Sequence, residues 1–215
     1  MQDEQQINKN RMVLLLIAGI PLTMILAATW LWYFVASGDL DLVGALGTAN
    51  RGSLVQPPRQ IDDGDLKGED GYPFLYQDLE PKWTMLVPSS DGRCGADCAN
   101  SLYVTRQIHV AMGKEFPRLR RLYVGDTRVA ETPVYLDNGE DTAVLGEFLA
   151  AEHRGIRTAV AEPATQRVLF EEYQEDATTW YLLDPAGWIM MSYNGEVHYK
   201  DVISDLKFLL KNSSE

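Results

Sequence analysis

The sequence WTMLVPSSDGRCGADC, at residues 83–98, is the stretch that decides the fold. Its first five residues are rich in β-formers and predict a short strand, and PSSDGR, at residues 88–93, is typical of a turn. After Cys98, apolar residues recur at helical spacing as far as Gly113. The two cysteines, Cys94 and Cys98, are therefore expected where a strand gives way to a helix.

The elements that follow this stretch predict the rest of the domain. They are a strand at 121–124, a short extended piece at 134–136, a helix at 142–153, two strands at 179–183 and 188–193 around the turn DPAG, and an amphipathic helix at 199–211. The order is strand, helix, strand, helix, hairpin, helix. A βαβ unit followed by a β-hairpin and a C-terminal helix describes the thioredoxin fold, so we expect an α/β, thioredoxin-like domain.

Upstream, residues 12–36 contain no charged side chain. As a helix they would span roughly 37 Å, which is enough to cross the ~30 Å hydrocarbon core of a membrane. A cleaved signal peptide is the alternative, but its apolar region is usually shorter and ends at small residues. Lys9 and Arg11 precede the span and Asp39 and Asp41 follow it. The basic flank predicts a cytoplasmic N-terminus and a domain on the far side of a bacterial inner membrane, in the periplasm.

These patterns divide the chain of 215 residues into four parts. We expect a cytoplasmic N-terminus at 1–11, a transmembrane helix at 12–36, a linker rich in Gly, Pro and acidic residues at 37–70, and the thioredoxin-like domain at 71–215.

The formal net charge is −12, which argues against nucleic acid as a partner because phosphate binding needs clustered Lys and Arg. An acidic run at 62–70 is interpreted as a solvated loop or as a docking patch. A basic group at 114–121 is interpreted as a solvated face, with pairing to the acidic run or contact with a partner as the alternatives.

Cys94 and Cys98 are the two cysteines of the chain. Residues four apart on a helix share a face, and a helix N-terminus favours the thiolate. A redox pair, a soft-metal clip and a plain stabilising disulfide all remain open, although so short a loop adds little stability. As catalytic residues, the two cysteines would carry out thiol-disulfide exchange.

A metal would need a third ligand besides the two thiolates. His109 lies about three helical turns beyond Cys98, which is too far, and His153 ends the second predicted helix with no evident link to the pair. His198 should lie near the sheet end that carries the cysteines, so it is the candidate third ligand, with an exposed histidine at a helix start as the alternative. Met190 and Met191 face opposite sides of a strand, so at most one of them could serve, and core packing is their default role.

The residues resemble the Sco/SenC family, membrane-anchored thioredoxin-like proteins that serve copper assembly of cytochrome c oxidase. The likeness is carried by the strand ending at Val87, by the CxxxC of Cys94 and Cys98, and by YLLDPAG at 181–187, which is similar to the family's YLIDPxG hairpin. GTANRGSL at 47–54 and LYVTRQ at 102–107 are closer still to small uncharacterised anchored proteins of bacterial cytochrome c oxidase gene clusters.

The resemblance breaks at the ligand set that it implies. The family's copper-binding histidine falls a few residues before the YLIDP strand, and Asp176 holds that position here. A carboxylate is a harder ligand than imidazole and a poor third partner for Cu(I). Copper is therefore at most a transient cofactor.

Three functions follow from these expectations. The first is an oxidase biogenesis factor that presents Cys94 and Cys98 to an oxidase subunit or to another assembly factor, either to exchange disulfides or to hold copper briefly. The second is a non-catalytic anchored subunit or scaffold with a locked disulfide. The third is a general thiol-disulfide or peroxide-reducing enzyme, against which stand the CxxxC rather than CxxC spacing and the lack of a peroxidatic motif.

Overall fold

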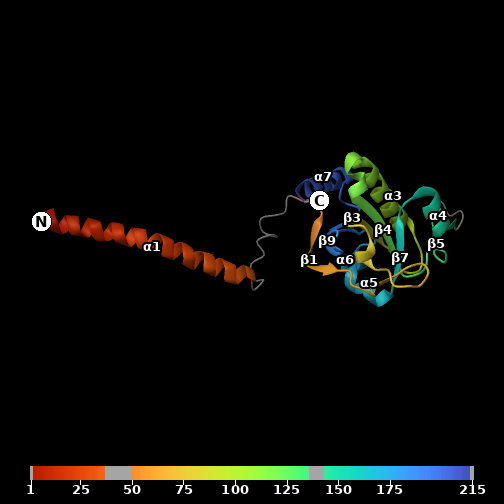
Figure 1. Cartoon of the computed structure of the whole chain (residues 1–215), viewed down its shortest axis with the longest axis horizontal. Coiled ribbons are helices and arrows are strands. Elements are labelled where there is room, and N and C mark those ends of the chain that lie inside the picture. The colour runs from red at the N-terminus through yellow and green to blue at the C-terminus, as the bar shows by residue number, and fades with distance from the viewer. Residues whose placement is uncertain (1, 37–49, 136–142, 214–215) are drawn as a thin grey trace. The chain divides into compact units, whose positions relative to one another are not determined.

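The structure, a computed structural model, describes residues 2–36, 50–135 and 143–213. The chain divides into two compact units, Met1–Ala49 and Asn50–Glu215. The first contains the helix α1, Gln2–Ala36, and the second contains the sheet and the remaining helices (Figure 1).

Helix α1 contains the predicted apolar span. Its segment Arg11–Phe34 has 24 residues and a mean hydropathy of 2.4, and none of it is buried within the protein. Thr23 and Thr29 donate their hydroxyl hydrogens to the carbonyls of Ile20 and Ile25, at 2.9 and 2.8 Å, so these polar groups are satisfied inside the helix. Length and composition fit a single membrane span, and a signal sequence near an N-terminus would meet the same criteria.

The second unit is built on a seven-stranded mixed sheet, in the order β1-β9-β8-β3-β4-β7-β2. The strands are β1 Ser53–Gln60, β2 Leu66–Lys67, β3 Trp83–Pro88, β4 Leu119–Gly125, β7 Arg157–Ala161, β8 Trp180–Leu183 and β9 Trp188–Tyr193. The pairs β3–β4 and β4–β7 are parallel, and the other four pairs are antiparallel. A separate two-stranded sheet pairs β5, Pro133–Val134, with β6, Ala143–Val144.

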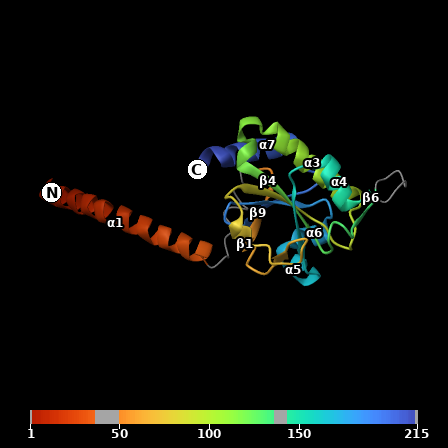
Figure 2. The same ribbon diagram turned by 45° about the vertical axis from the view of Figure 1, so that its right-hand side comes forward.

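Helices cover both faces of the main sheet (Figures 1 and 2). One face carries α3 Ala96–Ala111, α4 Leu145–Glu152 and α7 Tyr199–Asn212, and the other carries the short helices α5 Pro163–Leu169 and α6 Glu171–Glu175. Two 3-10 turns, η1 Tyr76–Asp78 and η2 Gly113–Arg118, complete the unit.

Alternation along the central strands creates two hydrophobic cores. Met85 and Val87 of β3 pack with α3, α4 and α7, whereas Leu86 between them packs on the opposite face with α5 and α6. In β8, Leu182 and Tyr181 divide in the same way. A strand whose residues are buried on both faces reads as a continuous apolar run. The sequence of β3 shows such a run.

The predicted α/β, thioredoxin-like order is confirmed for β3, α3, β4, α4, the β8–β9 hairpin and α7. The sequence reading missed β7, which supplies the third parallel strand, and also β1, β2, α5 and α6. Residues 136–142, at the junction of the predicted extended piece and helix, lie outside the described residues.

The segment 37–70, predicted as a linker, differs most from its prediction. From residue 50 onward it belongs to the domain unit, and it contributes β1 and β2 to the main sheet. Strand β1 contains Pro57 and Pro58, and its pairing with β9 shifts register between Leu54 and Arg59. Proline cannot donate to a strand ladder and is confined to edge strands and bulges, and β1 is an edge strand.

Asp205 of α7 ties the start of β1 to the rest of the domain. It is buried, and its Oδ2 accepts hydrogen bonds from the backbone N–H of Arg51 at 2.8 Å, from that of Gly52 at 3.2 Å and from the hydroxyl of Tyr193 at 3.3 Å. Burial and the neighbouring Asp205 carboxylate raise the pKa of Tyr193, which keeps this hydroxyl a donor.

Replacement of Asp205 by Ala should lower the free energy of unfolding by about 3 kcal/mol, because the buried Gly52 N–H and Tyr193 hydroxyl lose this carboxylate acceptor. Thermal and urea unfolding followed by circular dichroism would measure this loss. Asp201→Ala is the control on the same helix, with an expected loss of at most about 1 kcal/mol from the helix N-terminus. Equal losses in the two variants would contradict the role of Asp205.

Candidate functional site

A tight turn between β3 and α3 places the first cysteine. The Ser89 N–H donates to the carbonyl of Val124 at 2.9 Å, and the Ser89 hydroxyl donates to the carbonyl of Arg93 at 2.9 Å. Asp91 and Gly92 have φ values of 66° and 61°, and the Gly92 N–H donates to the Asp126 carboxylate at 3.0 Å. Left-handed backbone at two successive residues reverses the chain, which is the reason for an Asp-Gly pair here.

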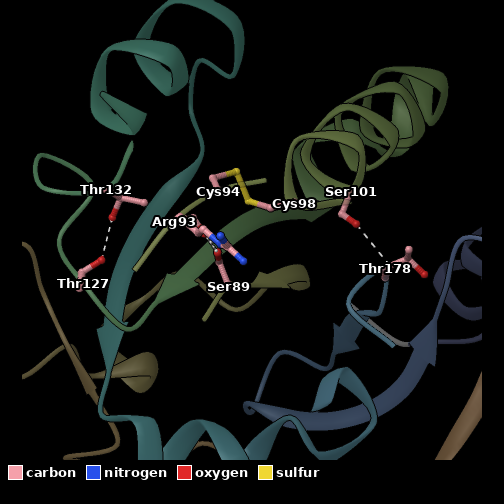
Figure 3. Close-up of a disulfide and its surroundings, with 8 residues drawn as sticks. All are labelled: Ser89, Arg93, Cys94, Cys98, Ser101, Thr127, Thr132 and Thr178. Carbon is pink, nitrogen blue, oxygen red and sulfur yellow. Dashed lines mark hydrogen bonds between the residues drawn. A yellow bond between two sulfur atoms is a disulfide. The ribbon is translucent and has the colours of Figure 1, made fainter. Parts of the chain in front are cut away.

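Cys94 and Cys98 form a disulfide with a Cα–Cα distance of 5.2 Å (Figure 3). Cys94 precedes Gly95, the N-cap residue of α3, and Cys98 lies in the first turn of that helix. The predicted placement of the pair at a strand-to-helix junction is confirmed. The junction lies at the carboxyl end of β3. This strand pairs in parallel with β4 and antiparallel with β8, and the two pairings fix its position.

The backbone of Cys94 pairs with strand β5 of the small sheet. The Cys94 N–H donates to the carbonyl of Pro133, and the Tyr135 N–H donates to the carbonyl of Cys94, both at 2.9 Å. Cys94 is 0% exposed and Cys98 is 6% exposed, and both belong to the core beneath α3 together with Val134 and Leu145. Cys98 is therefore the cysteine nearer to solvent.

Further hydrogen bonds hold the segment before β5 in place. The hydroxyls of Thr127 and Thr132 lie 2.9 Å apart, and the Thr132 hydroxyl also donates to the carbonyl of Arg128 at 2.8 Å (Figure 3). The Val129 N–H donates to the Glu69 carboxylate at 3.1 Å. The sequence predicted an extended piece at 134–136, which overlaps β5, but not its pairing with Cys94, because that contact joins residues far apart along the chain.

The loop before β8 lies against the start of α3 and contains Asp176. The Ser101 hydroxyl donates to the carbonyl of Thr178 at 3.3 Å, which joins the loop to the helix (Figure 3). The Asp176 carboxylate accepts from the N–H and hydroxyl of Thr178, at 2.9 and 2.6 Å, and from the Asn194 amide at 3.1 Å. These hydrogen bonds from Thr178 lower the pKa of Asp176. The carboxylate thus organises its own loop.

His198 occupies a helix start and is exposed. It is the N-cap residue of α7, and its Nδ1 accepts a hydrogen bond from the Lys200 N–H at 3.2 Å. It lines a cleft of about 220 Å³ with Ser101 and Thr178. Across residues 2–36, 50–135 and 143–213, no group of three His, Cys, Asp or Glu side chains could hold a metal.

The structure therefore brings Cys94 and Cys98 together but does not add His198 as a third ligand. Asp176 does not take the place of that histidine, because its carboxylate is engaged by Thr178 and Asn194. Met191 is buried in the core, as its default role predicted. The donor set in the described residues does not fit a Cys₂His copper site.

The other two histidines are packed in the protein. His109 stacks on Phe116 with ring centroids 3.8 Å apart, and its Nε2 lies 3.0 Å from the Phe116 carbonyl. His153 is 1% exposed, and its Nδ1 lies 3.3 Å from the Arg121 guanidinium. Burial, followed by the charge of Arg121, lowers the pKa of His153 to about 4.

The family model of the transmembrane-like, thioredoxin-like C-terminal domain matches residues 83–213, more than half of the chain. The chain belongs to this family. No curated protein matches the chain significantly.

Solved structures of Sco proteins resemble this thioredoxin-like domain. Yeast Sco1 is 17% identical with a TM-score of 0.54, and the match covers 74% of this chain and 99% of Sco1. Copper-bound yeast Sco1 is also 17% identical, with a TM-score of 0.49 and coverage of 78% and 97%. BsSco, a member of the Sco family of cytochrome c oxidase assembly proteins in which a disulfide switch was identified, is 14% identical, with a TM-score of 0.49 and coverage of 73% and 96%. At 17% identity and a TM-score of 0.54, the likeness to yeast Sco1 shows the fold alone.

The lowered pKa of His153 predicts acid sensitivity of the domain. The folded pKa of about 4 lies below the ordinary 6.5, so the unfolded chain binds the extra proton first. The contribution of neutral His153 to the free energy of unfolding is complete above pH 6.5. It decreases by ~1.4 kcal/mol per pH unit as the pH falls toward 4. His153→Gln should reduce the slope of unfolding free energy against pH by about that amount.

Denaturant unfolding between pH 6.5 and 4.5 would measure the two slopes. Leu149→Ala, a buried neighbour on α4 without a titratable group, is the control: it should lower stability and keep the wild-type slope. Identical slopes for the wild type and His153→Gln would show that His153 is not the group responsible.

Proposed function

We propose that this chain is a membrane-anchored assembly factor of cytochrome c oxidase that exchanges its Cys94–Cys98 disulfide with the thiols of a partner. The observation that carries the proposal is the disulfide itself, held at the N-terminus of α3 in a thioredoxin-like domain. The residues that resemble the Sco/SenC family, and the description of BsSco as an oxidase assembly protein with a disulfide switch, support the biological setting. The partner is an oxidase subunit or another assembly factor.

The exchange consists of two balanced steps. A partner thiolate attacks Cys98 Sγ, an S–S bond forms between the partner and Cys98, and Cys94 leaves as a thiolate that takes up a proton. The second thiol of the partner loses its proton and attacks the partner's first sulfur in the mixed disulfide, which releases Cys98 as a thiolate. The partner dithiol is oxidised by two electrons, and Cys94 and Cys98 are reduced.

The chain's own residues direct this reaction to Cys98. Amide groups at the N-terminus of α3 favour negative charge on a sulfur in the first turn, so they stabilise the Cys98 thiolate that leaves in the second step. Cys94 lies deeper, with its backbone hydrogen bonded to β5. Because no third copper ligand joins the pair in the described residues, the proposal contains no resident copper and no step through copper.

We further propose that α1 anchors the domain in a bacterial inner membrane with the N-terminus in the cytoplasm and the domain in the periplasm. The apolar segment Arg11–Phe34 and the basic residues before it support this topology. The periplasm is oxidising, so a disulfide persists there and acts as the oxidant toward a partner dithiol.

One observation favours a second candidate function, a scaffold with a locked disulfide. Both cysteines are buried, and Cys94 is joined to β5 by two backbone hydrogen bonds. If β5 and β6 never release the pair, a partner thiolate has no access and the disulfide serves stability alone. The short loop would then add ~2 kcal/mol.

Single cysteine variants separate the two candidates. Cys94→Ser leaves Cys98 as a free thiol, which can attack the disulfide of an oxidised partner in the reverse of the exchange and release one partner thiolate. Because Cys94 is no longer there to resolve the product, the mixed disulfide should accumulate as a larger band on non-reducing gels. Cys98→Ser leaves the buried Cys94 and should trap several-fold less. Acid quenching and alkylation of membranes, with Cys94→Ser/Cys98→Ser as control, would measure both. No trapped species with Cys94→Ser would favour the scaffold.

The cellular test is deletion of the gene, followed by the CuA signal and the activity of cytochrome c oxidase. Wild-type protein should restore both, and Cys94→Ser/Cys98→Ser should not, although its unfolding midpoint should fall only by the amount that ~2 kcal/mol implies. Full restoration of oxidase activity by the double variant would rule out the exchange reaction.

A further inference from the structure

A cleft of about 680 Å³ lies at the end of the sheet opposite the disulfide. Lys82, Leu119 and Arg157, which line it, stand at the starts of the parallel strands β3, β4 and β7. The disulfide instead follows the carboxyl end of β3. The cleft is thus a separate feature from the cysteine site.

The cleft is positively charged in a chain whose net charge is −12. Six cationic side chains line it, against three carboxylates. The cations are Lys82, Arg106, Arg120, Arg121, Arg154 and Arg157, and the carboxylates are those of Asp78, Glu80 and Glu152. Concentrated positive charge on an acidic protein raises the local concentration of anions at that point.

Only part of this charge is neutralised by the protein. Arg106 pairs with Glu152 at 3.1 Å, and Lys82 pairs with Glu80 at 2.6 Å. Among the residues that the structure describes, no carboxylate lies within ion-pair distance of the other four arginines. The predicted alternative, in which the basic group pairs with the acidic run, is not what the structure shows.

Arg121 and Arg120 are the most enclosed of these unpaired cations. Arg121 is 5% exposed, and its guanidinium donates to the carbonyls of His153 and Arg154, each at 3.4 Å, at the C-terminal end of α4. Burial lowers the pKa of Arg121 to about 10, so it stays charged at neutral pH. Arg120 donates through Nη2 to the carbonyl of Glu80, and its Nη1 is shielded from solvent without a hydrogen-bond partner in the described residues.

Capping of α4 explains Arg121 but not the rest of the cluster. The partial negative charge of a helix C-terminus is about half an elementary charge. Arg106 and Arg121 already meet that end of the helix, since Arg106 also donates to the carbonyl of Glu152. Arg154 and Arg157 are exposed and add two further charges at the same place.

One wall of the cleft is apolar. Val110 and Phe116 line it and are 63% and 44% exposed, next to Pro117. A site with guanidinium groups on one side and exposed apolar side chains on the other suits a ligand with an anionic group attached to an apolar part. The planar guanidinium fork matches phosphate and carboxylate oxygens in pairs.

We propose that this cleft is a binding site for a small organic anion, held through a phosphate or carboxylate group by Arg120, Arg154 and Arg157. Arg121 supplies buried positive charge behind them, and Phe116 contacts the apolar part of the ligand. The site is independent of the disulfide and of the exchange reaction.

Isothermal titration of the full-length chain in a non-ionic detergent tests the proposal, with pyrophosphate and citrate as probes at matched ionic strength. At least one probe should bind with a Kd below 1 mM, on the order of what two or three charge-assisted hydrogen bonds supply. Arg154→Gln/Arg157→Gln should weaken that binding at least about tenfold. The probe that binds more tightly identifies phosphate or carboxylate as the preferred group.

The matched control is Arg128→Gln/Arg167→Gln, which removes two exposed arginines outside the cleft and changes the net charge equally. It should bind like the wild type. Arg120→Gln, checked for folding by circular dichroism, should weaken binding in the same direction as the cleft variant. Failure of both probes to bind, or equal weakening in the control, would overturn the proposal.

Discussion

The rest of the domain depends on the burial of β3 between two strands and two layers of helices. Its parallel pairing with β4 and its antiparallel pairing with β8 satisfy both edges of its backbone. Met85 and Val87 face one core and Leu86 faces the other, so the strand has no solvent face. If β3 shifted by one residue against its neighbours, each of its side chains would move to the opposite core. The carboxyl end of β3 is therefore fixed in space, and the turn that follows it delivers Cys94 to one place.

That fixed point accounts for the character of the candidate site. The disulfide lies at the first turn of α3, and the backbone of Cys94 is hydrogen bonded to Pro133 and Tyr135. The same end of the sheet receives the loop before β8, where Asp176 serves the loop's own hydrogen bonds. The site therefore holds two bonded sulfurs at the first turn of α3, next to strand β5.

The accuracy of the sequence interpretation follows the strength of each local pattern. Strand β3, the β8–β9 hairpin and α7 have long apolar or amphipathic patterns with clear turn residues, and these predictions were correct. Strand β7 is five residues long, begins with Arg157 and is followed by Pro163, so nothing in its pattern separates it from a loop. Strand β1 was predicted as part of a linker because Pro57 and Pro58 signal extended chain, and only pairing with β9 makes that chain a strand.

The sequence by itself determined the apolar span, the acidic character, the junction that holds the two cysteines and the absence of a histidine at position 176, because each is a property of local order along the chain. Only the tertiary structure decided which groups meet. It paired β5 with Cys94, assigned His198 to the start of α7, and gathered arginines from α3, β4, β7 and the turn after α4 into one cleft. Contacts between residues far apart in sequence depend on strand order and crossover, and these are set by the packing of the whole sheet.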